Sequence, residues 1–203
     1  MNASDPVTLT PALLAACTGA KASDAERWCE PLQDGMTRFE ISTRRRVGMY
    51  LANLAHESMK LSRVREIWGP SPAQLRYDPP TTLARNLGNT QMGDGRRYLG
   101  RSPIQITGRW NYGNARDKLR KTVPDAPDFE ATPELLEEPK WGALVAAWFF
   151  SSHGCNAYAD VGDFDGVCDL INRGKKTLEA GDSNGYYERL LFWMGAQKAL
   201  GIT

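Results

Sequence analysis

The feature that most constrains the fold is a long stretch, residues 69–113, in which no hydrophobic period is sustained. It contains the runs "GPSP", "DPP", "GDG" and "GRSP". Glycine and proline at this density interrupt both helices and strands. One short helix is expected there, around "TTLARNLG", and no long strand. The sequence therefore predicts a loop-rich lobe inserted into the middle of the chain.

Helical patterns precede this lobe. Thr10 as N-cap, Pro11 at the first helical position and Gly19 beyond the end bracket a helix "PALLAAC". Ser23, followed three residues later by Glu26, has the pattern of a capping box before a second helix. Residues 1–40 are thus expected to form an N-terminal helical part.

Further helices are expected on both sides of the lobe. Apolar residues at helical spacing predict one over 43–58, and another is expected over 111–121. "PELLEE" starts a further helix after Thr132. "KWGALVAAWFFSSHG" is apolar almost all round, which indicates a buried central helix that ends at Gly154. "DFDGVCDLINRG" and "SNGYYERLLFWMGAQKALG" complete a mainly α chain, which we expect to form a single domain over 1–203.

Charge and hydropathy exclude two classes of partner. Lysine and arginine number 25 against 24 aspartates and glutamates, a formal charge of +1, so nucleic-acid binding is not expected. No apolar run approaches the ~20 residues that cross a bilayer, so stable membrane insertion is not expected either. The N-terminal "MNASDPVTLTP" lacks the basic and apolar regions of a signal peptide.

The cysteines and histidines do not form the pattern of a metal-binding site. There is no C-x-x-C arrangement, and only two histidines are present, so neither a metal nor another cofactor is expected. Pairs 17–29 and 155–168 are candidate disulfides, but four free buried thiols are preferred in a chain without a visible secretion signal. The four cysteines are Cys17, Cys29, Cys155 and Cys168.

Two glutamates in "HESMKLSRVREIW" are candidates for an acid and a base. On one straight helix, Glu57 and Glu66 would face opposite sides, about 13 Å apart along the axis. The helical pattern fades just after Glu57, however, and a turn between the two would let both face one cleft. Glu57 follows Leu54 on the apolar stripe, where desolvation favours a protonated general acid, whereas Glu66 is expected to stay ionised. Such a pair suits a glycosidase; two solvated surface charges are the alternative that spacing does not exclude.

The segment "GDGRRYLGRSPIQITGRWNYG" has the composition of a sugar-binding cleft. Aromatic rings stack on pyranose faces, and amides and hydroxyls bind sugar hydroxyls. A phosphate-binding loop is the rival interpretation, but neither glycine-rich phosphate motif is present. The aromatic, amide and hydroxyl residues of the segment are Tyr98, Gln105, Thr107, Trp110, Asn111 and Tyr112.

Together, "LANLAHES", "REIW", this long segment and "LINRG" resemble glycoside hydrolase family 19, the chitinase-like enzymes of plants and bacteria and related bacteriophage endolysins. The motifs occur in order over residues 45–195. The resemblance implies a lysozyme-like helical fold, in which the glycine-rich lobe forms one side of the cleft. It also implies cleavage of β-1,4-linked N-acetylhexosamine chains with inversion.

The resemblance also implies roles for individual residues. Glu57 matches the general acid, Glu66 the base that activates water, and Thr107 the hydroxyl that holds this water. His56 is expected to orient the backbone or the cleft arginines rather than to react. The resemblance gives Gln105, Asn111 and Asn172 as substrate-binding amides and Arg189 as an arginine near the acid and base. Together with Tyr98 from the composition of the segment, and with His56, they form the predicted substrate-binding set.

The sequence also departs from the family pattern. Met59 and Lys60 stand where the family often has two glycines, while Ser102 and Arg173 each replace another glycine. No proposed catalytic group is removed. The bulkier side chains put the choice of substrate in doubt more than activity.

The leading hypothesis is an endolysin with muramidase-like activity on peptidoglycan glycan strands. Its short compact chain, the missing signal and the absence of an appended binding module favour the bacterial wall. Such a protein would act as a monomer, staying in the host cytoplasm until a holin-type partner gives it access to the wall in the periplasm. The alternatives are a chitinase, an exported antibacterial effector, a lytic transglycosylase with one carboxylate, and a non-catalytic glycan-binding module.

Overall fold

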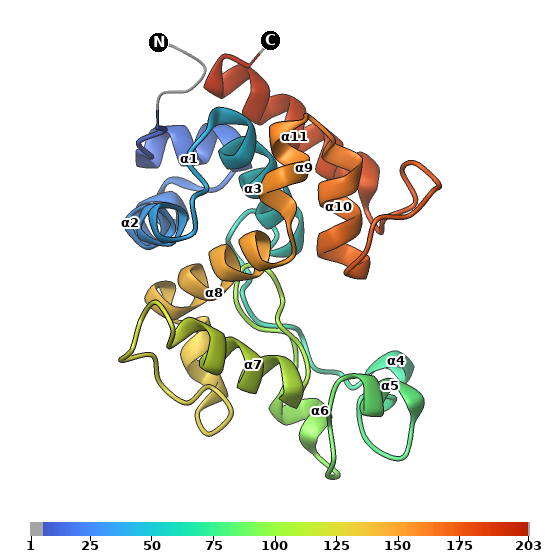
Figure 1. The fold of residues 1–203 in the computed structure, drawn as a ribbon. Coiled ribbons are helices and arrows are strands. Elements are labelled where there is room, and N and C mark those ends of the chain that lie inside the picture. The colour runs from blue at the N-terminus through green and yellow to red at the C-terminus, as the bar shows by residue number, and fades with distance from the viewer. Residues whose placement is uncertain (1–5, 203) are drawn as a thin grey trace.

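The computed structural model describes residues 6–202, and the chain is mainly α-helical, as predicted (Figure 1). Within these residues the only β pairing consists of two isolated bridges, Arg65 with Arg101 and Arg101 with Ile106. The helices in chain order are α1 Pro11–Thr18, α2 Ala22–Arg38, α3 Arg44–Glu57, α4 Pro72–Leu75, α5 Thr82–Asn86, α6 Asp94–Arg97, α7 Arg109–Leu119, the 3₁₀ helix η1 Pro133–Glu137, α8 Pro139–Ser152, α9 Cys155–Asp160, α10 Phe164–Arg173 and α11 Tyr186–Leu200.

The helices form two groups on either side of α8 (Figure 1). One group contains α1, α2, α3 and α9 to α11, with α3 packed on α11 and α2 packed on α8. Its core includes the fully buried rings of Trp28, Tyr50 and Phe150. The other group contains α4 to α7 and corresponds to the predicted loop-rich lobe. Helix α8 is almost entirely buried, as its all-round apolar sequence predicted.

The structure confirms most of the predicted helix start and stop signals. Thr10 accepts a hydrogen bond from the backbone N–H of Leu13, and Gly19 ends α1 in the left-handed conformation. Thr43 caps α3 in the same way as Thr10 caps α1. These interactions lie within one turn of the helix, so the sequence specifies them directly.

The capping box at Ser23 is wrong. Helix α2 already begins at Ala22, its N-cap is Lys21, and no side chain caps it. Because Ser23 lies inside the first turn, its hydroxyl is not at the position from which an N-cap accepts. Three smaller differences from the prediction are found. Helix α7 starts at Arg109 rather than at residue 111, and "PELLE" forms a 3₁₀ helix. Cys155–Asp160 forms a separate helix, α9, that was not predicted.

All four cysteines are free and buried, which agrees with the preferred interpretation. Burial raises the pKa of Cys17 to about 11 and those of Cys155 and Cys168 to about 12. Thiols so protected stay protonated near neutral pH and react slowly. Of the helices within residues 6–202, none has the length and apolar character needed to cross a membrane.

Candidate active site

A left-handed turn separates the two candidate carboxylates. Helix α3 ends at Glu57, and the next residues include three with positive φ: Met59 at 50°, Lys60 at 62° and Leu61 at 65°. The predicted break after Glu57 is therefore confirmed. A side chain in this conformation costs roughly 1–2 kcal/mol. The family resemblance places glycines at Met59 and Lys60, which would adopt the same backbone without that cost.

Glu57 lies against a buried cation. Its side chain is 19% exposed, and its carboxylate pairs with the Nη2 group of Arg189 on α11. The guanidinium is itself fixed, because Nη1 donates to Oδ1 of Asn53 at 2.8 Å and Nε donates to the carbonyl of Asn184 at 3.0 Å. The prediction of apolar surroundings for Glu57 is therefore wrong. Its side chain is at the end of the apolar stripe, where α11 brings a polar network against it.

His56 also faces α11, but it contacts an acid rather than an arginine. Its Nδ1 lies 2.7 Å from Oε2 of Glu188. The ring packs tightly against the backbone before α11, since a Cβ added at Gly185 would lie 2.1 Å from Cε1 of His56. Gly185 also has a φ of +71°. The expected orienting role of His56 thus has a specific partner in Glu188.

Glu66 is held by the loop lobe. Its backbone N–H donates to the carbonyl of Gly100 at 2.8 Å, and the N–H of Gly100 donates back to Oε2 of Glu66 at 2.9 Å. Gln74 donates to Oε1 at 2.8 Å, and the hydroxyl of Tyr77 lies 3.4 Å from the same atom. Burial, together with the neighbouring charge of Glu66, raises the pKa of Tyr77. Both carboxylate oxygens of Glu66 therefore face a hydrogen-bond donor of the loop lobe.

Thr107 and Gln105 converge with Glu66 on one glycine. A Cβ added at Gly100 would lie 2.6 Å from Oε1 of Gln105, 3.2 Å from Oγ1 of Thr107 and 3.5 Å from Cβ of Glu66. The Thr107 hydroxyl donates to the carbonyl of Gln105 at 2.9 Å, which leaves its oxygen free to accept. Gly100 therefore allows three predicted site residues to approach one another.

The remaining predicted residues divide into two kinds. Asn111 donates to the carbonyl of Thr107 at 2.7 Å, and Asn172 accepts from the N–H of Asn184 at 3.0 Å, so both brace the loops beside the carboxylates. Tyr98 is different, because it is 1% exposed and its hydroxyl donates to the carbonyl of Glu130. Its burial leaves no ring face for a sugar, whereas Trp110 is 61% exposed.

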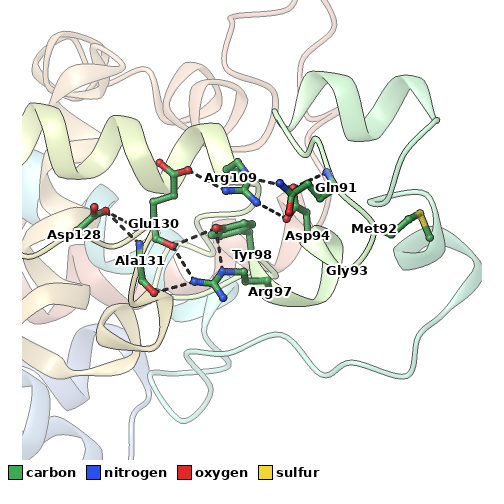
Figure 2. Close-up of a pocket in the computed structure, with 10 residues that line it drawn as sticks. All are labelled: Gln91, Met92, Gly93, Asp94, Arg97, Tyr98, Arg109, Asp128, Glu130 and Ala131. Carbon is green, nitrogen blue, oxygen red and sulfur yellow. Dashed lines mark hydrogen bonds and ion pairs between the residues drawn. The ribbon is translucent and has the colours of Figure 1, made fainter.

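A pocket of about 600 Å³ lies between the lobe and residues 128–131, and neither Glu57 nor Glu66 lines it. Its lining residues are drawn in Figure 2. Its charged groups satisfy one another: Arg109 pairs with Asp94 at 2.6 Å and with Glu130 at 3.0 Å. Burial pushes the pKa of Asp94 upward, but hydrogen bonds from Arg109 and two backbone N–H groups hold it below its usual value. Arg97 donates to the carbonyl of Ala131 at 2.9 Å. The ion pairs that line this pocket therefore hold α6 and α7 together.

Three contributors were missed from the sequence: Asn53, Gln74 and Glu188. Asn53 precedes Glu57 by four residues and is the polar exception in "YLANLA", a signal that would have placed it on the same helix face. Gln74 also closes a capping box with Ser71. Glu188 carries no comparable signal, since its contact with His56 exists only because α11 packs on α3.

Fold and site together define a mainly helical protein with one carboxylate on the helical part and another on the loop lobe. The relatives named below are chitinases. No family model matches the chain. Chitinase 6 of Oryza sativa subsp. japonica is 24% identical over 174 residues, covering 83% of this chain and 59% of that protein. An endochitinase of Arabidopsis thaliana is 28% identical over 160 residues, covering 79% and 50%.

Solved structures show the same fold. Chitinase C from Streptomyces griseus HUT6037 superposes with a TM-score of 0.69 at 19% identity, over 97% of this chain and 78% of that one. A class IV, family 19 chitinase from Zea mays gives 0.68 at 17% identity, over 97% and 94%. The resemblance to family 19 and its lysozyme-like fold are confirmed. The chain spans between 50% and 59% of the length of the two plant relatives named above.

Proposed function

We propose that this protein is a glycoside hydrolase that cleaves β-1,4 bonds between N-acetylhexosamine units with inversion at the anomeric carbon. The observation that carries the proposal is the placement of two carboxylates on either side of a left-handed turn, each held by its own hydrogen-bond network. The carboxylate of Glu57 pairs with Arg189. The carboxylate of Glu66 accepts hydrogen bonds from the N–H of Gly100 and the amide of Gln74. Groups held in this way satisfy the requirement that an acid and a base be oriented before substrate arrives.

In the proposed reaction, Glu57 gives a proton to the glycosidic oxygen as the bond to the anomeric carbon breaks. Glu66 takes a proton from a water molecule that attacks the opposite face of that carbon, and Thr107 accepts a hydrogen bond from the same water. Inversion needs room for this water, so we expect the two carboxyl groups to stand roughly 6.5–9.5 Å apart with substrate bound. The two proton transfers leave the net charge of the site unchanged.

The substrate we propose is the glycan strand of peptidoglycan, with the protein acting as a monomeric endolysin. Release from the host cytoplasm to the periplasmic wall by a holin-type partner completes this proposal. A chitinase is the second candidate, and the names of the similar plant and bacterial proteins favour it. The two candidates differ in the polymer that is cut, so digestion of peptidoglycan and of chitin oligomers separates them.

The test is mass spectrometry of borohydride-reduced fragments after digestion of purified peptidoglycan. Reduced muramic acid at the new ends would support muramidase activity, and reduced glucosamine ends would indicate a glucosaminidase. Anhydro ends would replace the two-carboxylate mechanism by that of a transglycosylase. Release of fragments from chitin oligomers alone would favour the chitinase, and sugar binding without any turnover would identify a binding module.

The catalytic assignment is tested separately with Glu57→Gln. General acids contribute about two to four orders of magnitude, so the variant should lose at least about a hundredfold in rate. Its melting temperature should fall as well, because Gln leaves the buried charge of Arg189 uncompensated, so the rates are compared at a temperature at which both proteins are folded. A Glu57→Gln protein that digests sacculi at the wild-type rate would refute the assignment.

A further inference from the structure

The net charge of +1 conceals a strong separation of charge along the chain. Residues 60–121, from the turn after α3 to the end of α7, contain thirteen lysines and arginines but only four aspartates and glutamates, a formal charge of +9. The rest of the chain then has twelve basic and twenty acidic residues, a charge of −8. The basic segment is the loop lobe together with the turn that leads into it.

All four acidic residues of the segment already form ion pairs or accept hydrogen bonds within the protein. Asp94 and Asp117 pair with arginines of α7 at 2.6 and 2.7 Å. Asp78 accepts hydrogen bonds from the backbone N–H groups of Gly93 and Gly95, at 3.0 and 2.8 Å. Glu66 has the contacts described above. None of these carboxylates forms an ion pair with the arginines of α4 to α6.

Four exposed arginines occupy the outer end of the lobe. They follow α4 or lie on α5 and α6, which stand together in Figure 1. Within residues 6–202, no carboxylate oxygen lies within 4.0 Å of any of their guanidinium groups. Backbone carbonyls are the acceptors for two of them, and these do not neutralise the charge. The outer arginines are Arg76, Arg85, Arg96 and Arg97.

This part of the chain is also fixed in place. Gly93 and Gly95 bind Asp78, and the amide of Asn89 donates to the carbonyl of Tyr77 at 2.8 Å. The stretch between α4 and α5 is thereby tied to α6. Because the Debye length is about 8–10 Å at physiological salt, neighbouring charges on such a unit produce one combined field close to the surface. Fields of this kind raise association rates of oppositely charged ligands by about 10–10³-fold.

We infer that the outer arginines of the lobe bind the carboxylates of an anionic glycan, and that the substrate is therefore peptidoglycan rather than neutral chitin. This inference rests on the proposed function, since the same lobe holds Glu66, Thr107 and Gln105. A polymer that reaches these residues lies within the field of the lobe. Chitin has no ionised group on which the field can act, whereas peptidoglycan carries carboxylates on its peptides.

The experiment measures co-sedimentation of the Glu57→Gln protein with purified sacculi, and with sacculi whose carboxyl groups have been converted to amides. We expect amidation to weaken binding about tenfold or more, and the difference to disappear as salt is raised. This comparison needs no variant of the lobe. Equal binding to native and amidated sacculi at low salt would overturn the inference.

A matched pair of charge reversals then locates the binding surface. The lobe variant is Arg76→Glu/Arg85→Glu/Arg96→Glu, and the control is Lys21→Glu/Arg27→Glu/Lys198→Glu, which changes the total charge equally at exposed positions outside the lobe. The lobe variant should lose about tenfold in affinity for native sacculi, and the control less than about twofold. Equal losses would show that net charge alone acts, and would overturn the inference.

Failure of the inference is distinguishable from failure of the proposed function. If the wild type releases no reduced ends from any glycan, the function fails, while the co-sedimentation comparison still reports on charge recognition. If fragments appear but amidation does not affect binding, only the inference fails. Tighter binding to duplex DNA than to native sacculi at one ionic strength would also overturn it.

Discussion

The buried guanidinium of Arg189 holds the carboxylate of Glu57, although the two residues are 132 positions apart in the chain. The pair joins the end of α3 to the first turn of α11. Asn53, one turn before Glu57, accepts from the other side of the same guanidinium and donates to the carbonyl of Met49 at 2.9 Å. Asn53 thereby fixes the cation that orients the proposed acid.

Replacing Asn53 by Ala should lower kcat more than it raises KM. The change leaves a buried N–H of Arg189 without a partner, which costs about 1–3 kcal/mol of stability. A small displacement of Glu57 would follow, and misplacement by about 1 Å costs up to about a hundredfold in rate. Steady-state kinetics and urea unfolding measure the two effects.

The comparison variant is Asn53→Asp, which keeps an oxygen facing Nη1 of Arg189. It should retain more of kcat than Asn53→Ala if positioning is the role of this residue. A variant series in which kcat follows the loss of stability alone would show that Asn53 is only structural.

Gly185→Ala should be more harmful than Gly174→Ala. Both glycines have left-handed backbones, with φ of +71° and +72°, so each substitution should cost roughly 1–2 kcal/mol in strain. A Cβ at Gly174 meets nothing within 4 Å, whereas at Gly185 it meets the ring of His56. The excess loss of stability and of activity in Gly185→Ala therefore measures the His56 contact. Equal effects in both variants would argue against any role for that contact.

Met59→Gly should stabilise the protein. Met59 is 55% exposed, so little packing is lost, while its φ of 50° imposes a strain of roughly 1–2 kcal/mol. The extra chain entropy of glycine offsets about 0.5–1 kcal/mol. A net gain of about 0.5–1 kcal/mol is expected in urea unfolding. Met59→Ala keeps the strained backbone and should show no such gain.

Asp169→Asn should destabilise the protein at neutral pH but have little effect in acid. Asp169 on α10 is fully buried and accepts from Thr177, Ser183 and Lys176. Burial alone would raise its pKa, yet these hydrogen bonds bring the pKa below its ordinary value. The stabilisation by the carboxylate is thus complete above the unfolded-state pKa of about 3.9 and is lost as the pH falls through the lower folded-state pKa.

Hydrogen bonds to a charged group contribute about 1.5–3 kcal/mol, so a loss of this order is expected for Asp169→Asn at pH 7. Unfolding free energies of the two proteins, measured from pH 7 down to pH 2, should converge at the acid end. A constant difference across that range would mean that the charge of Asp169 is not what stabilises the loop between α10 and α11.

The sequence by itself determined the mainly helical character, the left-handed end of α1 and the caps at Thr10 and Thr43. These follow from hydrogen bonds between residues within one helical turn, so a short window of sequence contains both partners. It also nominated Glu57, Glu66 and Thr107, through the motifs that resemble family 19 rather than through spacing. Ser23 shows the limit of such reasoning, because α2 starts two residues earlier than a Ser23 cap requires, which leaves the Ser23 hydroxyl inside the helix.

Only the tertiary structure decided what surrounds those residues. Packing of α11 on α3 placed Arg189 rather than apolar side chains against Glu57, and the bridge between Arg65 and Arg101 brought Gly100 to Glu66. Packing within the lobe buried Tyr98, although its residue type and neighbours suited a sugar cleft. Each of these contacts joins residues far apart in the chain. Their geometry depends on how whole helices and loops pack, which no local pattern contains.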